Sequence, residues 1–144
     1  MKWSRRVRTA AVMGLAWAVV WAPIAVLIGT LIIDPDNSMD EMWVAIGAYP
    51  GFLCGVLFAA MLGLPDTLRK FADVSLGRAV ALGASSGLIV GVMPFLVGSS
   101  TSQLPLWQLA MLVIGSFALM SAASAVGSVL VARRASKPEL RAFN

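Results

Sequence analysis

Four long apolar stretches dominate this chain, at roughly 9–33, 42–64, 76–98 and 105–132. Each exceeds the ~20 residues that a helix needs to cross ~30 Å of hydrocarbon. A chain in lipid must satisfy its backbone hydrogen bonds internally, which favours helices. Only 12% of the residues are charged, against about 25% in a typical soluble domain. The sequence therefore predicts an all-α membrane protein, a single domain of four transmembrane helices over residues 1–144.

The first apolar stretch follows a basic segment, as the core of a signal peptide does. Lys2, Arg5, Arg6 and Arg8 make up that segment. The stretch runs for about 24 residues, whereas a signal peptide has roughly 7–15, and no clear small-x-small cleavage site follows it. We therefore expect an uncleaved first helix.

The basic residues predict the orientation of the chain in the membrane. All Lys and Arg lie in the N-terminal tail, the 65–78 loop or the C-terminal tail, and the 34–41 and 99–104 loops have none. Cytoplasmic loops carry the excess of Lys and Arg in membrane proteins, so both termini are expected in the cytoplasm. This distribution places the positive charge beside anionic headgroups of the lipid bilayer, and we expect no nucleic-acid partner despite the net charge of +4.

The two halves of the sequence share a spacing. Five residues of the first half recur 64 positions later: Trp43, Gly51, Ala59, Gly63 and Arg69 match Trp107, Gly115, Ala123, Gly127 and Arg133. The spacing is compatible with a tandem repeat of helical hairpins related by an axis along the membrane normal, but the shared Gly, Ala and Trp usage of membrane helices explains it at least as well. Trp43 and Trp107 begin their spans, where tryptophan commonly anchors a helix at the interface.

An acidic segment, DPDNSMDEMW, separates the first two stretches. Asp34, Asp36 and Asp40 are weak candidates for cation ligands, because a calcium loop also needs glycine at its sixth position and glutamate at its twelfth. Met39 and Ala45 stand there instead. Ser38 and Glu41 fit the S-x-x-E capping box, so we favour a helix cap.

Two glycine stripes are the sharpest pattern in the sequence. Gly47, Gly51 and Gly55 recur at every fourth position, as do Gly83, Gly87 and Gly91. Residues four apart share a helix face, and small residues on that face let two membrane helices approach closely. We expect the stripes to pack the second helix on the third within one chain. A self-association face and the wall of a small pore are the alternatives.

Residue types that carry chemistry are scarce. The chain has no histidine, one cysteine (Cys54) and no charged residue deep inside any apolar stretch. Ion-coupled transporters normally keep ionisable groups in the membrane, and a catalytic site needs a convergent acid, base, nucleophile or metal. We therefore predict no catalytic residue, no metal, no cofactor and no enzymatic activity.

The segments DPDNSMDEMW, GAYPGFLCGVLF and LGRAVALGASSGLIVG, with the basic loop between the last two, resemble small four-helix proteins of bacteria that have no assigned activity. The resemblance implies a location in the bacterial inner membrane. Helix packing is then the expected mode of action, in an accessory subunit, assembly factor or regulator whose partners are other membrane subunits or a second copy of the chain. The alternative is a small homo-oligomeric channel or facilitator for a small solute.

Overall fold

The computed structural model describes residues 2–33, 35–36, 40–63, 71–98 and 105–141. Helix α1 spans Lys2–Ile28 and continues as a π-helix, η1, over Gly29–Ile33. Helix α2 spans Asp40–Met61, α4 spans Leu76–Val97 and α5 spans Leu106–Arg141. The described part of the chain contains no strand, and the expected all-α class is confirmed.

Four helices are long and apolar enough to cross a membrane, as expected. The spans are Arg6–Ile33, Glu41–Met61, Leu76–Val97 and Leu106–Ser136. The longest helix, α5, has 36 residues, which at 1.5 Å per residue makes it about 54 Å long. It therefore extends well past the end of the apolar stretch predicted at 105–132.

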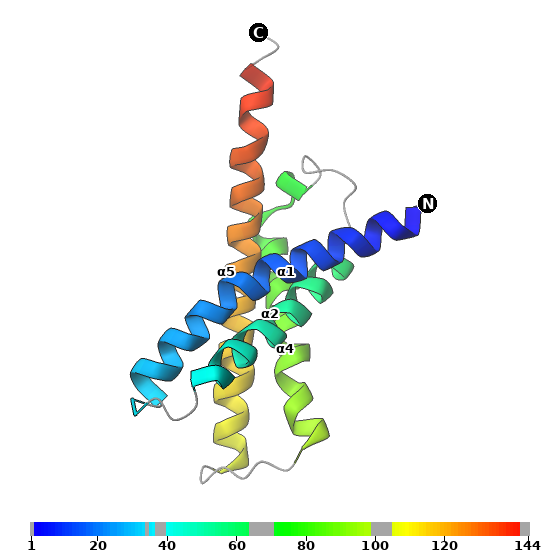
Figure 1. The fold of residues 1–144 in the computed structure, drawn as a ribbon. Coiled ribbons are helices and arrows are strands. Elements are labelled where there is room, and N and C mark those ends of the chain that lie inside the picture. The colour runs from blue at the N-terminus through cyan, green and yellow to red at the C-terminus, as the bar shows by residue number, and fades with distance from the viewer. Residues whose placement is uncertain (1, 34, 37–39, 64–70, 99–104, 142–144) are drawn as a thin grey trace. The chain divides into compact units, whose positions relative to one another are not determined.

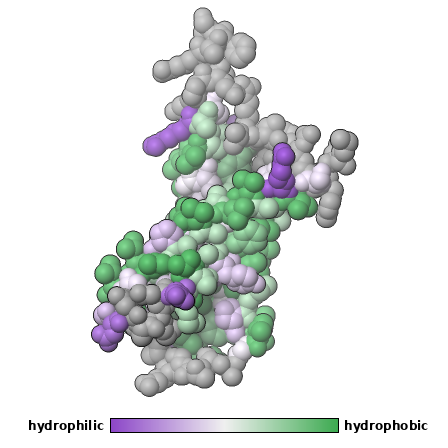
Figure 2. Space-filling model, in the orientation of Figure 1, coloured by the Kyte–Doolittle hydropathy of each residue, from purple (hydrophilic) through white to green (hydrophobic). Residues whose placement is uncertain are grey.

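The chain divides into two compact units, Met1–Ala60 and Met61–Asn144. The first contains α1, η1 and nearly all of α2, and the second contains α4 and α5 (Figure 1). Each unit is thus a helical hairpin. On the face drawn in Figure 2, hydrophobic residues make up most of the coloured surface, and strongly hydrophilic residues occur at a few places.

Local sequence explains where the helices begin and end. Ser75 is the N-cap of α4, and its hydroxyl accepts a hydrogen bond from the Arg78 amide at 3.3 Å. The carbonyl of Pro105 accepts hydrogen bonds from two amides of the first turn of α5, those of Gln108 and Leu109. Gly63 follows α2 with a φ of +80°, a conformation that glycine adopts without steric cost and that ends helices.

Candidate functional site

The glycine stripe of α2 lies against α1. A Cβ atom at Gly47 would be 2.6 Å from the Trp21 carbonyl oxygen, and one at Gly51 would be 2.8 Å from the Trp21 Cβ. At Gly55 the nearest atom would be the Met13 carbonyl oxygen, at 2.8 Å. These distances are too short for a side chain, so the α2 backbone lies directly on α1 along the whole stripe.

The glycine stripe of α4 lies in the same way against α5. A Cβ at Gly83 would be 2.8 Å from the Ser121 carbonyl oxygen, and one at Gly91 would be 3.0 Å from the Ile114 Cα. The tightest position is Gly87, where the nearest atom is the Phe117 carbonyl oxygen. The backbones of α4 and α5 therefore pack together without intervening side chains.

These contacts correct the expected pairing of the second helix with the third. Each stripe is covered by the other helix of its own hairpin, α1 for α2 and α5 for α4. Rows of small residues receive the stripes, but their spacing in the sequence does not by itself identify them as the partners. Those rows are Gly14, Ala22 and Ala25 on α1, and Ala118, Ala122 and Ala125 on α5.

The matched positions of the two sequence halves lie in different surroundings. Gly51 is buried against α1, whereas a Cβ at Gly115 or Gly127 would meet nothing within 4 Å. Trp43 is 8% exposed and Trp107 is 66% exposed. In the second hairpin the tightly packed glycines are on its first helix, so equivalent spacing does not mean equivalent packing.

A buried polar contact lies between α4 and α5 beside Gly87. The hydroxyl oxygens of Ser86 and Ser121 are 2.8 Å apart, and both residues are fully buried. The Ser86 hydroxyl is also 2.8 Å from the Gly83 carbonyl oxygen, to which it can donate. A hydroxyl has one proton, so Ser86 cannot donate to both oxygens at once. When Ser86 donates to the Gly83 carbonyl, the Ser121 hydroxyl is the donor of the contact with Ser86.

Other serines on these helices bond within their own helix. The hydroxyls of Ser85, Ser116 and Ser128 donate to carbonyls three or four residues earlier. Such local bonds satisfy the hydroxyl without joining two helices. The hydroxyl contact between Ser86 and Ser121, in contrast, joins α4 to α5.

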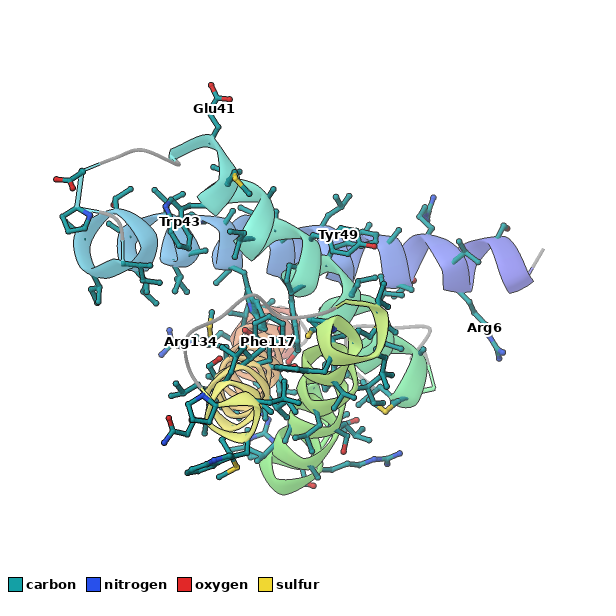
Figure 3. All side chains as sticks on the ribbon, turned by 90° about the horizontal axis from the view of Figure 1, so that it is seen from below. Arg6, Glu41, Trp43, Tyr49, Phe117 and Arg134 are labelled. Atoms are coloured by element: carbon teal, nitrogen blue, oxygen red, sulfur yellow. The ribbon has the colours of Figure 1, made fainter. Side chains whose placement is uncertain are left out.

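Trp43 packs on the π-helical end of α1. A Cβ at Gly29 would overlap the Trp43 indole ring, so only glycine leaves room for it. Figure 3 shows the Trp43 side chain directed from the start of α2 onto this helix. The indole nitrogen Nε1 is buried and has no hydrogen-bond partner in the described part of the chain. Trp43 thus contributes to the packing of the first hairpin, and interface anchoring stays a prediction for it and for Trp107.

Aromatic side chains fill the centre of the first hairpin. The rings of Trp17 and Phe58 stack with their centroids 5.2 Å apart. Trp21 is 2% exposed and Cys54 is fully buried. This arrangement has the character of a packed core, in which large rings fill the space beside the glycine stripe.

Arg133 holds the chain that precedes α4 against α5. Its Nε donates to the Ala72 carbonyl at 3.0 Å, and its Nη2 donates to the Val74 carbonyl at 2.9 Å. Two carbonyls of a connecting segment are thereby satisfied by one planar guanidinium. From the sequence, Arg133 was expected only as a topology signal and as one member of the 64-residue spacing, and no pattern pointed to this contact.

Part of the acidic segment lies outside the described residues. This holds for Asp34 and Ser38, so both the cation site and the capping box stay predictions. Asp36 and Glu41 are exposed, and Figure 3 shows Glu41 pointing away from the helices. Asp40 is the first residue of α2.

No group of three or more metal-binding side chains occurs among the described residues. Comparisons of the chain with protein-family models, with curated proteins and with solved structures return no significant match. The bacterial inner-membrane location that the resemblance implied stays a prediction. The function must therefore be inferred from the two hairpins and the residues at their surfaces.

Proposed function

We propose that this protein is a non-catalytic membrane protein that acts through helix packing, as an accessory subunit, assembly factor or regulator of a larger membrane complex. The observation that supports the proposal is that the surfaces suited to close helix packing are already occupied within the chain. Both glycine stripes are covered within their own hairpins, so each hairpin is a closely packed pair of helices with exposed apolar side chains.

The exposed apolar side chains of α5 illustrate what such a hairpin offers to a partner. Met111 is 72% exposed, Leu119 is 74% exposed and Val131 is 66% exposed. No charged residue occurs between Ala79 and Ala132. A surface of this kind can contact lipid or another transmembrane helix, and it carries no acid, base or metal ligand for chemistry.

The alternative, a small channel or facilitator, has less support. A pore wall made of the glycine stripes would need them uncovered, yet in both hairpins the stripes are occupied by a neighbouring helix. The hydroxyls of Ser85, Ser116 and Ser128 are bonded within their own helices, which leaves them less able to line a solute path.

Co-purification from the native membrane tests the proposal. The tagged chain is extracted in mild detergent, and a stoichiometric partner is expected by size-exclusion chromatography and mass spectrometry. The Gly87→Leu variant should lose that partner because it forces α4 and α5 apart, whereas Gly77→Ala, at an open position of the same helix, should retain it. A chain that elutes without any partner would refute the proposal, and a homo-oligomer that conducts in liposomes would establish the channel instead.

A further inference from the structure

Tyr49 places a hydroxyl on an exposed and otherwise apolar face of α2. The residue is 69% exposed, and its hydroxyl forms no hydrogen bond within the described part of the chain. It lies in the span Glu41–Met61, eight residues after Glu41, which places it about 12 Å along the helix from the start of the span. Its neighbours on this face, Met42, Ala45 and Ile46, are also exposed.

A hydroxyl at this depth is unfavourable against lipid alone. Hydrocarbon offers no hydrogen-bond partner, so an unpaired hydroxyl there costs free energy that a phenylalanine ring of the same shape would not cost. A tyrosine that only anchors a helix lies at the headgroup level, whereas Tyr49 is more than a third of the way along a helix that crosses ~30 Å of hydrocarbon. The exposed hydroxyl therefore indicates a polar partner on this side of α2.

The backbone beside Tyr49 lacks one of its ordinary hydrogen bonds. Pro50 lies inside α2 and has no N–H, so the Ile46 carbonyl has no donor four residues later. Ile46 is 44% exposed, and it shares a helix face with Tyr49 because residues three apart are neighbours on a helix. One face of α2 thus combines a phenol hydroxyl with a carbonyl that the helix itself does not satisfy in the usual way.

We propose that this face of α2 binds a transmembrane helix of the partner complex through a Ser, Thr, Asn or Gln side chain of that helix. Each of these side chains carries a donor and an acceptor, so it can pair with the Tyr49 hydroxyl and with the Ile46 carbonyl. Polar side chains of this kind join membrane helices, and the apolar neighbours on the face pack around the contact. The contact presupposes the proposed function, because it names the surface through which a partner subunit is bound.

Photocrosslinking of the full chain in its native membrane tests this contact. Photoreactive benzoylphenylalanine replaces Ala45, which is exposed one turn before Tyr49, and mass spectrometry identifies the crosslinked peptide. The crosslink should map to a transmembrane segment of another protein, with Ser, Thr, Asn or Gln within one turn of the crosslinked residue. One interhelical hydrogen bond changes affinity about 3- to 18-fold, so Tyr49→Phe should lower the crosslink yield about threefold or more at partner levels below saturation.

Controls separate this contact from a general effect of hydroxyl loss. Ser85→Ala removes another exposed hydroxyl, one that bonds to the Ala81 carbonyl within α4, and should keep the crosslink yield within about twofold. A crosslinker at Val19, 70% exposed on α1, should not capture the same segment. An unchanged unfolding midpoint establishes that Tyr49→Phe is folded.

The outcomes distinguish this contact from the proposed function itself. A partner segment that Tyr49→Phe captures with undiminished yield would overturn the contact and leave the proposed function standing. Crosslinks to lipid alone would make Tyr49 an anchor, and crosslinks to a second copy of the chain would make the face a self-association surface, so both would overturn the contact. A wild-type chain that also co-purifies with no other protein would refute the proposed function as well.

Discussion

Gly87→Ala is the substitution that tests the packing of the second hairpin most directly. A methyl group there would be 2.7 Å from the Ala118 Cα and closer still to the Phe117 carbonyl oxygen. Carbon atoms in contact normally lie ~3.5–4.0 Å apart. The obstructing atoms belong to the backbone and cannot rotate away, so α4 and α5 must separate by about 1 Å.

This separation has a second cost next to the substitution. The Ser86 and Ser121 hydroxyl oxygens are 2.8 Å apart, and moving them about 1 Å further apart exceeds the limit of a hydrogen bond. Overpacking costs about 1–3 kcal/mol, and an interhelical hydrogen bond in a membrane protein contributes about 0.6–1.7 kcal/mol. We expect Gly87→Ala to lower the free energy of unfolding by about 2–4 kcal/mol.

Titration with a denaturing detergent, followed by far-UV circular dichroism, measures this loss. Gly115→Ala is the matched control, because it makes the same change within α5 where a Cβ meets nothing within 4 Å, and it should alter stability by less than about 0.5 kcal/mol. Ser121→Ala should cost little more in the Gly87→Ala background, since the hydroxyl contact is already lost there. Equal stability of Gly87→Ala and Gly115→Ala, or full additivity with Ser121→Ala, would refute the argument.

Three further predictions concern other parts of the chain. Reporter fusions at Asn37 and Asn144 should report opposite sides of the membrane, with Asn144 in the cytoplasm; an external C-terminus would contradict the charge argument. Arg133→Gln should lower the free energy of unfolding by about 1.5–3 kcal/mol, because it loses charged hydrogen bonds to two carbonyls. The control Arg134→Gln, at an exposed position, should change it by less than about 0.5 kcal/mol. Equal effects of the two variants in the same detergent titration would show that the carbonyl contacts add nothing to stability. Trp43→Phe should leave the free energy of unfolding unchanged or raise it, because it removes a buried donor without an acceptor, and such a donor costs about 1–3 kcal/mol. A clear loss of stability would show that the indole N–H is hydrogen-bonded in the membrane.

The sequence alone determined the helices. Long uncharged apolar stretches leave the backbone no partner in lipid except itself, so their length and composition specify spans. The ends of the observed spans Glu41–Met61 and Leu76–Val97 lie within three residues of the expected 42–64 and 76–98. Pro23, Pro50 and Pro94 lie inside helices, as membrane helices tolerate.

Only the tertiary structure decided which helices the glycine stripes contact. A face without side chains is compatible with any neighbour that can approach closely, so Gly51 and Gly87 specify close approach without specifying a partner. The partner follows from the complementary row on the neighbouring helix, such as Ala118, Ala122 and Ala125 on α5. Those residues carry no distinctive spacing signal of their own in an alanine-rich helix. Likewise, the Ser86–Ser121 contact joins residues 35 positions apart, and only the register of two packed helices brings their hydroxyls together.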